Sequence, residues 1–418
     1  MHIIKGNIIH TKKIGELEII KDGGILIDDD GFIQEIYKNI PNDNQYEIID
    51  YSNSLIMQSF ADMHLHAPQF PMLGMGMDLP LISWLSKYTY KTEARFKDLD
   101  YARKTYRKLA KDLIDNGTTR VAMFSSLHVD ATLVLMEELE KAGVTGYVGK
   151  VNMDRNSSKE LKESTAESKR ETLRWLEECK KFKNIKPILT PRFTPSCTNE
   201  LMEFIGDLAN KENLYVQSHL SENIDEIKWV SDLHPESKQY WETYYQYGQW
   251  KSHTLMAHCV YSGAKERKAI KDHDVVVVYC PDSNINIASG ICPVRTFLDE
   301  GIWVTLGSDI AGGAMLEMYK NIQMAIKVSK IHTITTHYRS EYLSVSEAYY
   351  LATTSGHKYF DESLGFMKNK KLHAIVVDDS SFTNPVRELS LKERFERSIY
   401  LMNKDNIIAV YSEGKRVK

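Results

Sequence analysis

The feature that most constrains the fold of this chain is a repeated alternation of apolar segments with amphipathic segments. The apolar segments are short, which is typical of β-strands, and they occur at 56–61, 120–124, 146–151, 186–192, 214–218, 254–258, 275–280 and 302–307. Helical periodicity lies between them at 101–115, 131–141, 171–182, 200–209, 264–271 and 294–299. Eight strands with intervening helices predict an α/β protein of the TIM (β/α)8 barrel type.

A doubly wound open sheet is the alternative fold. It would be expected to carry a glycine-rich fingerprint after its first strand, and residues 57–69 contain none. The barrel is therefore favoured. Two further helical stretches, at 315–331 and 344–360, follow the eighth strand.

The two ends of the chain have a different pattern. Residues 1–57 consist of short apolar runs separated by Gly- and Asp-rich turns, and strand character returns at 372–378 and 406–411. Because chain ends often lie close together, we expect both ends to form one small β-sandwich domain. The predicted boundaries are 1–57 and 363–418 for this composite domain and 58–362 for the barrel.

Composition narrows the choice of partners. The net charge is −4 and the basic residues are scattered, so no nucleic-acid surface is expected. The five cysteines lack Cys-x-x-Cys pairing, which indicates free thiols in a reducing compartment. The N-terminus lacks signal-peptide features, and no run of about 18 apolar residues is present. These observations predict a cytoplasmic protein, without a membrane partner, that acts on a small molecule.

Histidines and an aspartate lie where predicted strands end. His64 and His66 are two residues apart, so on a strand their side chains leave the same face. Other predicted strands end at His219, His258 and Asp309. Reactive residues of a TIM barrel lie at the C-terminal ends of its strands. Three imidazoles and one carboxylate with room for a water predict a catalytic site of the kind that Zn²⁺ occupies.

Each of these residues alone also has a simpler explanation, as a loop histidine, a hydrogen-bonded strand end or a turn cap. Their shared placement favours a site. The other histidines are expected at the surface, with His128 ambiguous because it follows the second strand; they are His2, His10, His234, His273, His332, His337, His357 and His373.

Glu222 follows His219 by three residues, so its carboxylate is expected to reach the same pocket. A glutamate beside an activated water is suited to move protons between the nucleophile and the substrate. The alternative is a carboxylate that interacts with the N-terminus of a helix over 224–230, and both roles are compatible.

The motifs resemble those of the amidohydrolase superfamily, in its mononuclear aminohydrolase branch. They are FADMHLH at 60–66, QSHLSE at 217–222, MAH at 256–258 and LGSD at 306–309. Further stretches resemble the guanine deaminase family within that branch: SWL at 83–85, YVGKVNMD at 147–154, KPILTPRF at 186–193, CPDSN at 280–284 and DIAGG at 309–313. The resemblance extends over residues 59–356.

The resemblance implies one metal ion, Zn²⁺ or alternatively Fe²⁺, and the ligands His64, His66, His219 and Asp309. His258 would contact the attacking water or the forming oxyanion. Two-metal relatives have a modified lysine at the end of the fourth strand. Here that strand ends in Arg192 and Phe193, which is the reason to expect a single ion.

The same two residues suggest the substrate. Arg192 offers a rigid fork of donors suited to a ring carbonyl, and Gln69 can donate to and accept from an amide-like ring edge. Phe193 and Trp84 are expected to form aromatic walls, although Trp84 is equally explained as a packed lid residue. In the family that the chain resembles, the matching residues bind guanine, with a backbone contribution at Leu85.

The resemblance therefore implies hydrolysis of guanine to xanthine and ammonia, a reaction of purine catabolism. Asp309 would take a proton from the metal-activated water, and Glu222 would protonate the adjacent ring nitrogen and assist the departure of ammonia. The alternatives are an aminohydrolase or chlorohydrolase acting on a pterin, triazine or adenosine derivative, and a non-catalytic scaffold of the same fold. The cytidine-deaminase signature is absent. We further expect a homodimer.

Overall fold

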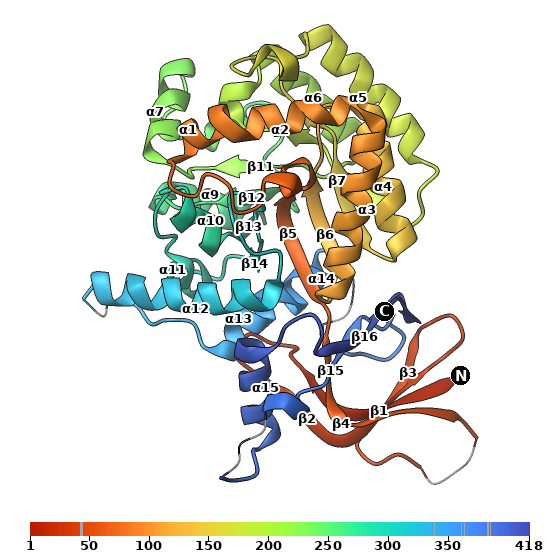
Figure 1. Ribbon diagram of the computed structural model, residues 1–418. Helices are drawn as coiled ribbons and strands as arrows, with labels where there is room; N and C mark the ends of the chain where they lie inside the picture. The colour runs from red at the N-terminus through yellow and green to blue at the C-terminus, as the bar shows by residue number, and fades with distance from the viewer. Residues whose placement is uncertain (42–44, 338, 361, 363, 383, 385) are drawn as a thin grey trace.

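A ring of parallel strands lies at the centre of the upper part of the molecule in Figure 1. The computed structural model describes residues 1–41, 45–337, 339–360, 362, 364–382, 384 and 386–418. The ring strands are β5 (Phe60–His66), β6 (Thr118–Phe124), β7 (Thr145–Gly149), β9 (Ile185–Pro187), β11 (Gln217–Leu220), β12 (Leu255–His258), β13 (Val276–Tyr279) and β14 (Val304–Leu306). They form two four-stranded sheets, in the orders β5-β6-β7-β9 and β11-β12-β13-β14.

Backbone hydrogen bonds join these two sheets at both sides. The Leu189 N–H donates to Tyr215 O at 3.0 Å, next to a short pair formed by β8 (Val151–Asn152) and β10 (Thr190–Pro191). On the other side, the Asp309 N–H donates to His64 O at 2.8 Å. The predicted TIM barrel is thereby confirmed.

Helices surround the ring, and their starts follow local sequence signals. They include α3 (Leu99–Asp115), α4 (Val129–Ala142), α5 (Thr165–Cys179), α6 (Asn199–Lys211), α7 (Ile224–Leu233), α9 (Ala264–Asp272), α11 (Val294–Asp299) and α12 (Met318–Thr335). The Asp98 side chain caps α3, and Ser164 with Glu167 forms a capping box on α5. The helix predicted at 344–360 is divided into α13 (Val345–Ala352) and α14 (Thr354–Lys358), because Thr353 leaves the helical conformation.

The first barrel strand differs from its predicted range of 56–61. That range crosses two strands, β4 (Glu47–Gln58) and β5, which are separated at Ser59. Apolar residues on both sides of Gln58 and Ser59 conceal this boundary in the sequence. As a result, His64 and His66 lie on the C-terminal part of β5 itself rather than in a loop after it.

Both chain ends contribute to one sheet below the barrel in Figure 1. Its described strands lie in the order β17-β16-β15-β4-β1-β2-β3. Their bounds are β1 (His2–His10), β2 (Glu18–Ile27), β3 (Ile33–Tyr37), β15 (Ala374–Val377), β16 (Ile407–Ser412) and β17 (Lys415–Arg416). The antiparallel pairing of β15 with β4 brings the C-terminal segment to the N-terminal one.

Alternate residues of this sheet enter two different cores. Ile56 and Val376 belong to a separate core of the sheet, whereas Met57 and Ile375 pack into the large core that includes barrel residues. The period of two along each strand explains this division. In the described part of the chain, no helix combines the length and the apolar character required to cross a membrane.

Candidate active site

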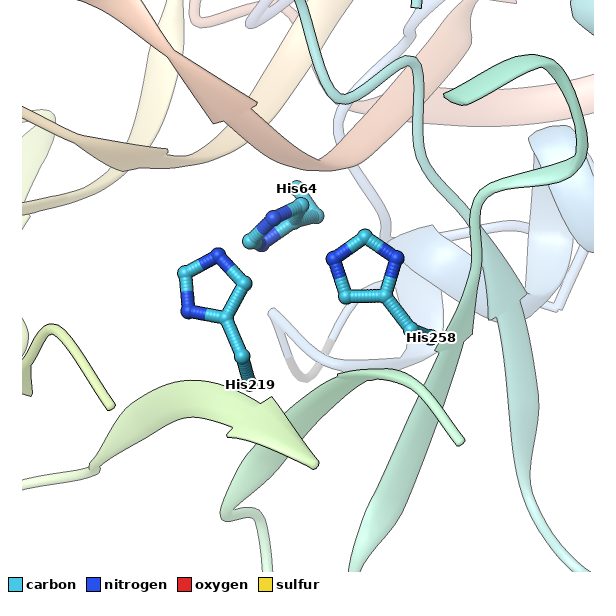
Figure 2. Close-up of side chains that lie close together, drawn as sticks. All are labelled: His64, His219 and His258. Atoms are coloured by element: carbon cyan, nitrogen blue, oxygen red, sulfur yellow. The ribbon is translucent and has the colours of Figure 1, made fainter. Parts of the chain in front are cut away.

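Four histidines from three barrel strands gather inside the ring. His64 and His66 lie on β5, His219 on β11 and His258 on β12. Figure 2 shows the imidazoles of His64, His219 and His258 turned toward one another. The ring centroids of His64 and His219 are 4.9 Å apart, and the Nε2 atoms of His66 and His219 are 3.3 Å apart. The structure therefore brings the four predicted histidines into one cluster.

Asp309 completes the cluster from the loop after β14. Its Oδ1 atom lies 3.3 Å from Nε2 of His64 and 3.3 Å from Nε2 of His66. Its Oδ2 atom accepts a hydrogen bond from Ser283 and lies 3.8 Å from Nε2 of His258. The backbone of Asp309 is left-handed, with φ of 47°. This conformation costs an L-residue about 1–2 kcal/mol, so the surrounding fold must enforce it.

Hydrogen bonds at the outer ring nitrogens orient two of the imidazoles. Nδ1 of His219 lies 2.6 Å from the backbone oxygen of Arg192, and Nδ1 of His258 lies 2.8 Å from Oδ1 of Asn284. A carbonyl oxygen only accepts, so each Nδ1 carries the hydrogen. In His219, which burial holds neutral, Nε2 therefore presents its lone pair to the cluster, as in histidines that bind metals.

The charges of the cluster suit a cation. Burial lowers the pKa of His64 to about 4 and holds the pKa of His219 well below its ordinary value, so both are neutral at pH 7. Burial alone would raise the pKa of Asp309, but its contacts with His64 and His66 outweigh burial and hold that pKa well below the usual range. Neutral imidazole nitrogens and a carboxylate oxygen facing one point fit a transition metal.

A buried nitrogen without a partner supports this fit. Nε2 of His64 forms no hydrogen bond with any described residue. The ligand atoms of His64, His66 and Asp309 all lie within 4.8 Å of one another, and so do those of His64, His219 and His258. A metal ion among these atoms would satisfy the nitrogen, whose burial is otherwise costly.

Another group of similar composition does not fit a cation. Glu362, His373 and Glu413 also lie within 4.8 Å of one another. However, the guanidinium of Arg120 lies between them and donates to both carboxylates. The positive charge that these groups require is therefore already supplied by the protein.

Glu222 is buried beside the histidine cluster. Its Oε1 atom accepts a hydrogen bond from Ser289 at 2.9 Å, and its Oε2 atom lies 3.5 Å from Nε2 of His258. Burial raises the pKa of Glu222, although the charge of His258 opposes that effect. The N-terminus of α7 is capped by Asn223 and Glu226 instead. Glu222 is thus available to the pocket, because other residues cap the helix.

A cavity opens over the cluster, with about 440 Å³ of empty space when the open solvent at its mouth is included. The lining includes all five residues predicted to contact a substrate, namely Gln69, Trp84, Leu85, Arg192 and Phe193. It also includes His66, His219, Glu222, His258 and Asp309. Trp84 serves two purposes, since it lines the cavity and its indole N–H donates to Met75 O at 3.0 Å. The cavity therefore joins the histidine cluster to aromatic walls and polar donors.

Glu93, on the short helix α2 (Tyr90–Ala94), is a polar residue of this site that the sequence did not reveal. Its carboxylate accepts hydrogen bonds from both terminal nitrogens of Arg192, at 2.6 and 3.1 Å, and from Nε2 of Gln69 at 2.8 Å. No motif or strand end marks Glu93, and its partner Arg192 is 99 residues away in the chain. A local sequence pattern contains no signal for such a contact.

The remaining histidines require a correction. His128 lies at the start of α4, outside both the histidine cluster and the cavity lining as far as the chain is described. Four histidines expected at the surface are instead buried: His10, His234, His357 and His373. Partners in the fold explain several of them; for example, His10 accepts a hydrogen bond from the Phe366 N–H at 3.0 Å. Sequence position alone did not reveal these long-range partners.

Comparisons with known proteins agree with this geometry. The model of the amidohydrolase family matches residues 55–417. Guanine deaminase from Dictyostelium discoideum is 36% identical, over 100% of this chain and 98% of that protein. Guanine deaminase from Homo sapiens is 33% identical, over 100% of this chain and 96% of that protein. The chain belongs to the amidohydrolase family.

Similarity to a solved structure is closer still. The crystal structure of guanine deaminase from C. acetobutylicum, which has guanine bound in its active site, is 44% identical to this chain. The two superpose with a TM-score of 0.96, over 99% of each chain. The barrel, the terminal sheet and their mutual arrangement are therefore shared with a member of that family.

Proposed function

We propose that this protein is a metal-dependent guanine deaminase, which hydrolyses guanine to xanthine and ammonia. The observation that carries the proposal is that Arg192 and Gln69 line the same cavity as the histidine cluster. A donor pair suited to a ring carbonyl thus lies beside a donor set suited to a catalytic metal. The full-length similarity to guanine deaminases supports the same substrate.

His64, His66, His219 and Asp309 would hold the metal. A divalent transition metal at this position supplies Lewis acidity, which makes a nucleophile available from water near neutral pH. We propose zinc, with Fe²⁺ as the alternative, because imidazole and carboxylate ligands suit both ions.

Protein side chains perform the proton transfers. Asp309 accepts a proton from the attacking water, and Nε2 of His258 faces the same position. Glu222 gives a proton to the ring nitrogen next to the carbon that bears the amino group. It then assists the departure of that group as ammonia, so that water and guanine yield xanthine and ammonia in balance.

The other cavity residues bind and orient the purine. Arg192 and Gln69 donate to the ring carbonyl, and the backbone at Leu85 adds a polar contact. Trp84 and Phe193 enclose the flat ring, because aromatic faces stack favourably on heterocycles. Enclosure also excludes bulk water, which strengthens the polar contacts.

A panel of substrates tests the proposal. Ammonia release is measured with guanine, adenine, a pterin, a triazine and cytosine at equal concentrations. Guanine should give the highest kcat/KM by a wide margin. Efficient turnover of another heterocycle without guanine turnover would assign the protein to a different reaction within the family, and no turnover of any would favour the scaffold alternative.

Elemental analysis tests the metal site. Protein purified without added metal should contain one transition-metal ion per chain, and His219→Ala should lower that content. Glu413→Ala is the matched control, since Glu413 belongs to the group around Arg120 and should not affect the metal content. Two ions per chain, or equal loss in both variants, would contradict the assignment.

Three further expectations complete the proposal. We propose a cytoplasmic location, which the five free, buried cysteines support, and a homodimer, which sedimentation equilibrium tests. We also propose that 58–362 and the combined segments 1–57 and 363–418 are separate structural units. The position of β4 in the terminal sheet and of β5 in the barrel supports a boundary near Ser59.

A further inference from the structure

We infer that Glu93 is a positioning residue that sets the specificity of this site for a ring carbonyl, by holding Arg192 and Gln69 as hydrogen-bond donors. The inference rests on the proposed function, because it assumes a purine in this cavity. Glu93 belongs to α2, outside the ring of strands, and its side chain is 3% exposed.

The geometry of the Arg192 contact fixes the guanidinium plane. Nη1 donates to Oε2 of Glu93 at 2.6 Å, and Nη2 donates to Oε1 at 3.1 Å. Such a two-point contact determines orientation as well as distance. The guanidinium also lies over the ring of Tyr90, at 5.5 Å from its centroid. Arg192 has five N–H donors, so three remain after the contact with Glu93.

The orientation of the Gln69 amide is fixed by hydrogen bonds to two neighbours, Glu93 and Ala311. Nε2 donates to Oε1 of Glu93 at 2.8 Å, whereas Oε1 of Gln69 accepts from the Ala311 N–H at 3.1 Å. A carboxylate cannot donate and a backbone N–H cannot accept, so both contacts exclude the flipped amide. One N–H of the Gln69 amide remains for a ligand.

The Glu93 carboxylate therefore acts on two donors at once. Both residues line the cavity, so a ligand there meets N–H groups whose directions are already set. The negative charge of Glu93 also balances the positive charge of Arg192. A neutral ring that presents a carbonyl fits this arrangement, whereas a ring that presents an amino group would place a donor against donors.

Glu93→Gln keeps the size of the side chain but removes the second acceptor oxygen and the charge. Its single oxygen cannot accept from Arg192 and Gln69 as the carboxylate does, and its amide N–H groups face other donors. We expect the KM for guanine to rise about tenfold, with kcat changed by less than about threefold, because leaving buried partners unsatisfied weakens binding. Metal content should stay unchanged.

A matched pair of inhibitors separates positioning from general damage. Hypoxanthine and adenine are purines without the 2-amino group, and at C6 the first has a carbonyl and the second an amino group. In the wild type, hypoxanthine should inhibit more strongly than adenine. Glu93→Gln should reduce the ratio of the two inhibition constants about tenfold. A pocket that is merely distorted would weaken both inhibitors equally, and an unchanged ratio would overturn the inference.

Two further proteins sharpen the test. Glu163→Gln is the control for loss of a buried carboxylate, since Glu163 accepts from Lys150 at 2.8 Å outside the cavity lining, and it should leave the inhibitor ratio unchanged. In an Arg192→Ala background, Glu93→Gln should raise the KM for guanine by a smaller factor than it does in the wild type, because the effects of contacting residues are not independent. If the fold-changes of the two single variants simply multiply in the double variant, Glu93 does not act through Arg192.

Failure of the inference and failure of the proposed function are distinguishable. If the wild type releases no ammonia from guanine, the proposed function fails, and calorimetry of hypoxanthine and adenine still measures the carbonyl preference. If guanine turnover is efficient and Glu93→Gln retains the wild-type ratio, only the role of Glu93 fails.

Discussion

Two buried arginines of the barrel have different surroundings. Arg120, on β6, donates through Nε to Glu362 at 2.6 Å, through Nη1 to Thr119 O at 3.1 Å and through Nη2 to Glu413 at 2.9 Å. Among the described residues, Arg192 has a single carboxylate partner, Glu93, and it borders the cavity. Each nitrogen of Arg120 has a protein partner, whereas Arg192 keeps donors for a ligand.

The comparison teaches how to separate a structural charge from a functional one. Burial and ion pairing are common to both arginines, so neither property identifies a site. What differs is the number of donors left over and the space that they face. Arg120 also connects the barrel with the segment of Glu413, next to the terminal sheet, so its contacts stabilise the junction of the two parts.

The largest expected effect lies in the cavity that Arg192 borders. Glu222→Gln should reduce kcat for guanine by about 10² to 10⁴, because the amide keeps the shape but cannot carry the proton. Metal content and unfolding midpoint should stay close to those of the wild type. Steady-state ammonia release and elemental analysis measure this outcome, and near-normal turnover would show that Glu222 does not transfer protons.

The second largest effect is expected on stability, from the group around Arg120. Arg120→Ala should lower the free energy of unfolding by about 3–5 kcal/mol, since it leaves Glu362 and Glu413 without their buried cation. The kcat/KM of the protein that remains folded should be nearly unchanged. Denaturant titration with parallel assays tests this separation. If Arg120→Ala lowers activity without lowering stability, Arg120 does not have the structural role that distinguishes it from Arg192.

Arg192→Ala should lower activity more than stability, which is the opposite of the result expected for Arg120→Ala. We expect a loss of about 1–3 kcal/mol in transition-state binding of guanine, or roughly 5- to 150-fold in kcat/KM, with metal content unchanged. Stability should fall less than in Arg120→Ala, because Arg192 lines the cavity and its removal would let water from there reach Glu93. The wild type should not turn over adenine. Assays of both substrates with both proteins decide this, and full guanine activity in the variant would show that Arg192 does not bind the substrate.

The smallest expected effect is a pH dependence near Arg120. Burial, with the charge of Arg120, lowers the pKa of His357 to about 3, from an ordinary value of 6.5. Between these two pKa values the unfolded chain binds one proton more than the folded chain. The free energy of unfolding therefore falls as the pH falls below 6.5. His357→Gln should lose stability less steeply, by about 1 kcal/mol between pH 6.5 and 5.5.

Denaturant titrations at several pH values test this difference. The neighbouring charged and titratable groups of Arg120, Glu362 and His373 are present in both proteins, so their own contributions cancel in the comparison. Parallel slopes for wild type and His357→Gln would show that His357 is not held neutral by the fold.

The sequence predicted the parts of the site that follow strand periodicity. His64, His66, His219, His258 and Asp309 come together because parallel strands of a barrel end at one rim. Glu93 and the group around Arg120 could not be predicted in this way. Their partners are side chains from distant segments. Glu93 lies on a helix of five residues, which is too short for a periodic pattern to predict the direction of its side chain.

The same distinction applies to the fold. Alternating strands and helices predicted the barrel, and the positions of most strands are close to those observed. The predicted domain boundary at 57/58 lies close to the break between β4 and β5, but the strand predicted over 56–61 crosses that break, because apolar residues stand on both sides of Gln58 and Ser59. Only the pairing of each strand with a different sheet separates them.

The pairing of β4 with β15 has a consequence for synthesis of the chain. Gln58 and Ala374 are partners in this pairing, and at translation rates of about 5–20 residues per second Ala374 is made roughly 15 to 60 seconds after Gln58. During that interval one edge of β4 lacks its native neighbour, and unpaired strand edges promote aggregation. A chain terminated before residue 374 would contain the complete histidine cluster and still leave that edge permanently unpaired.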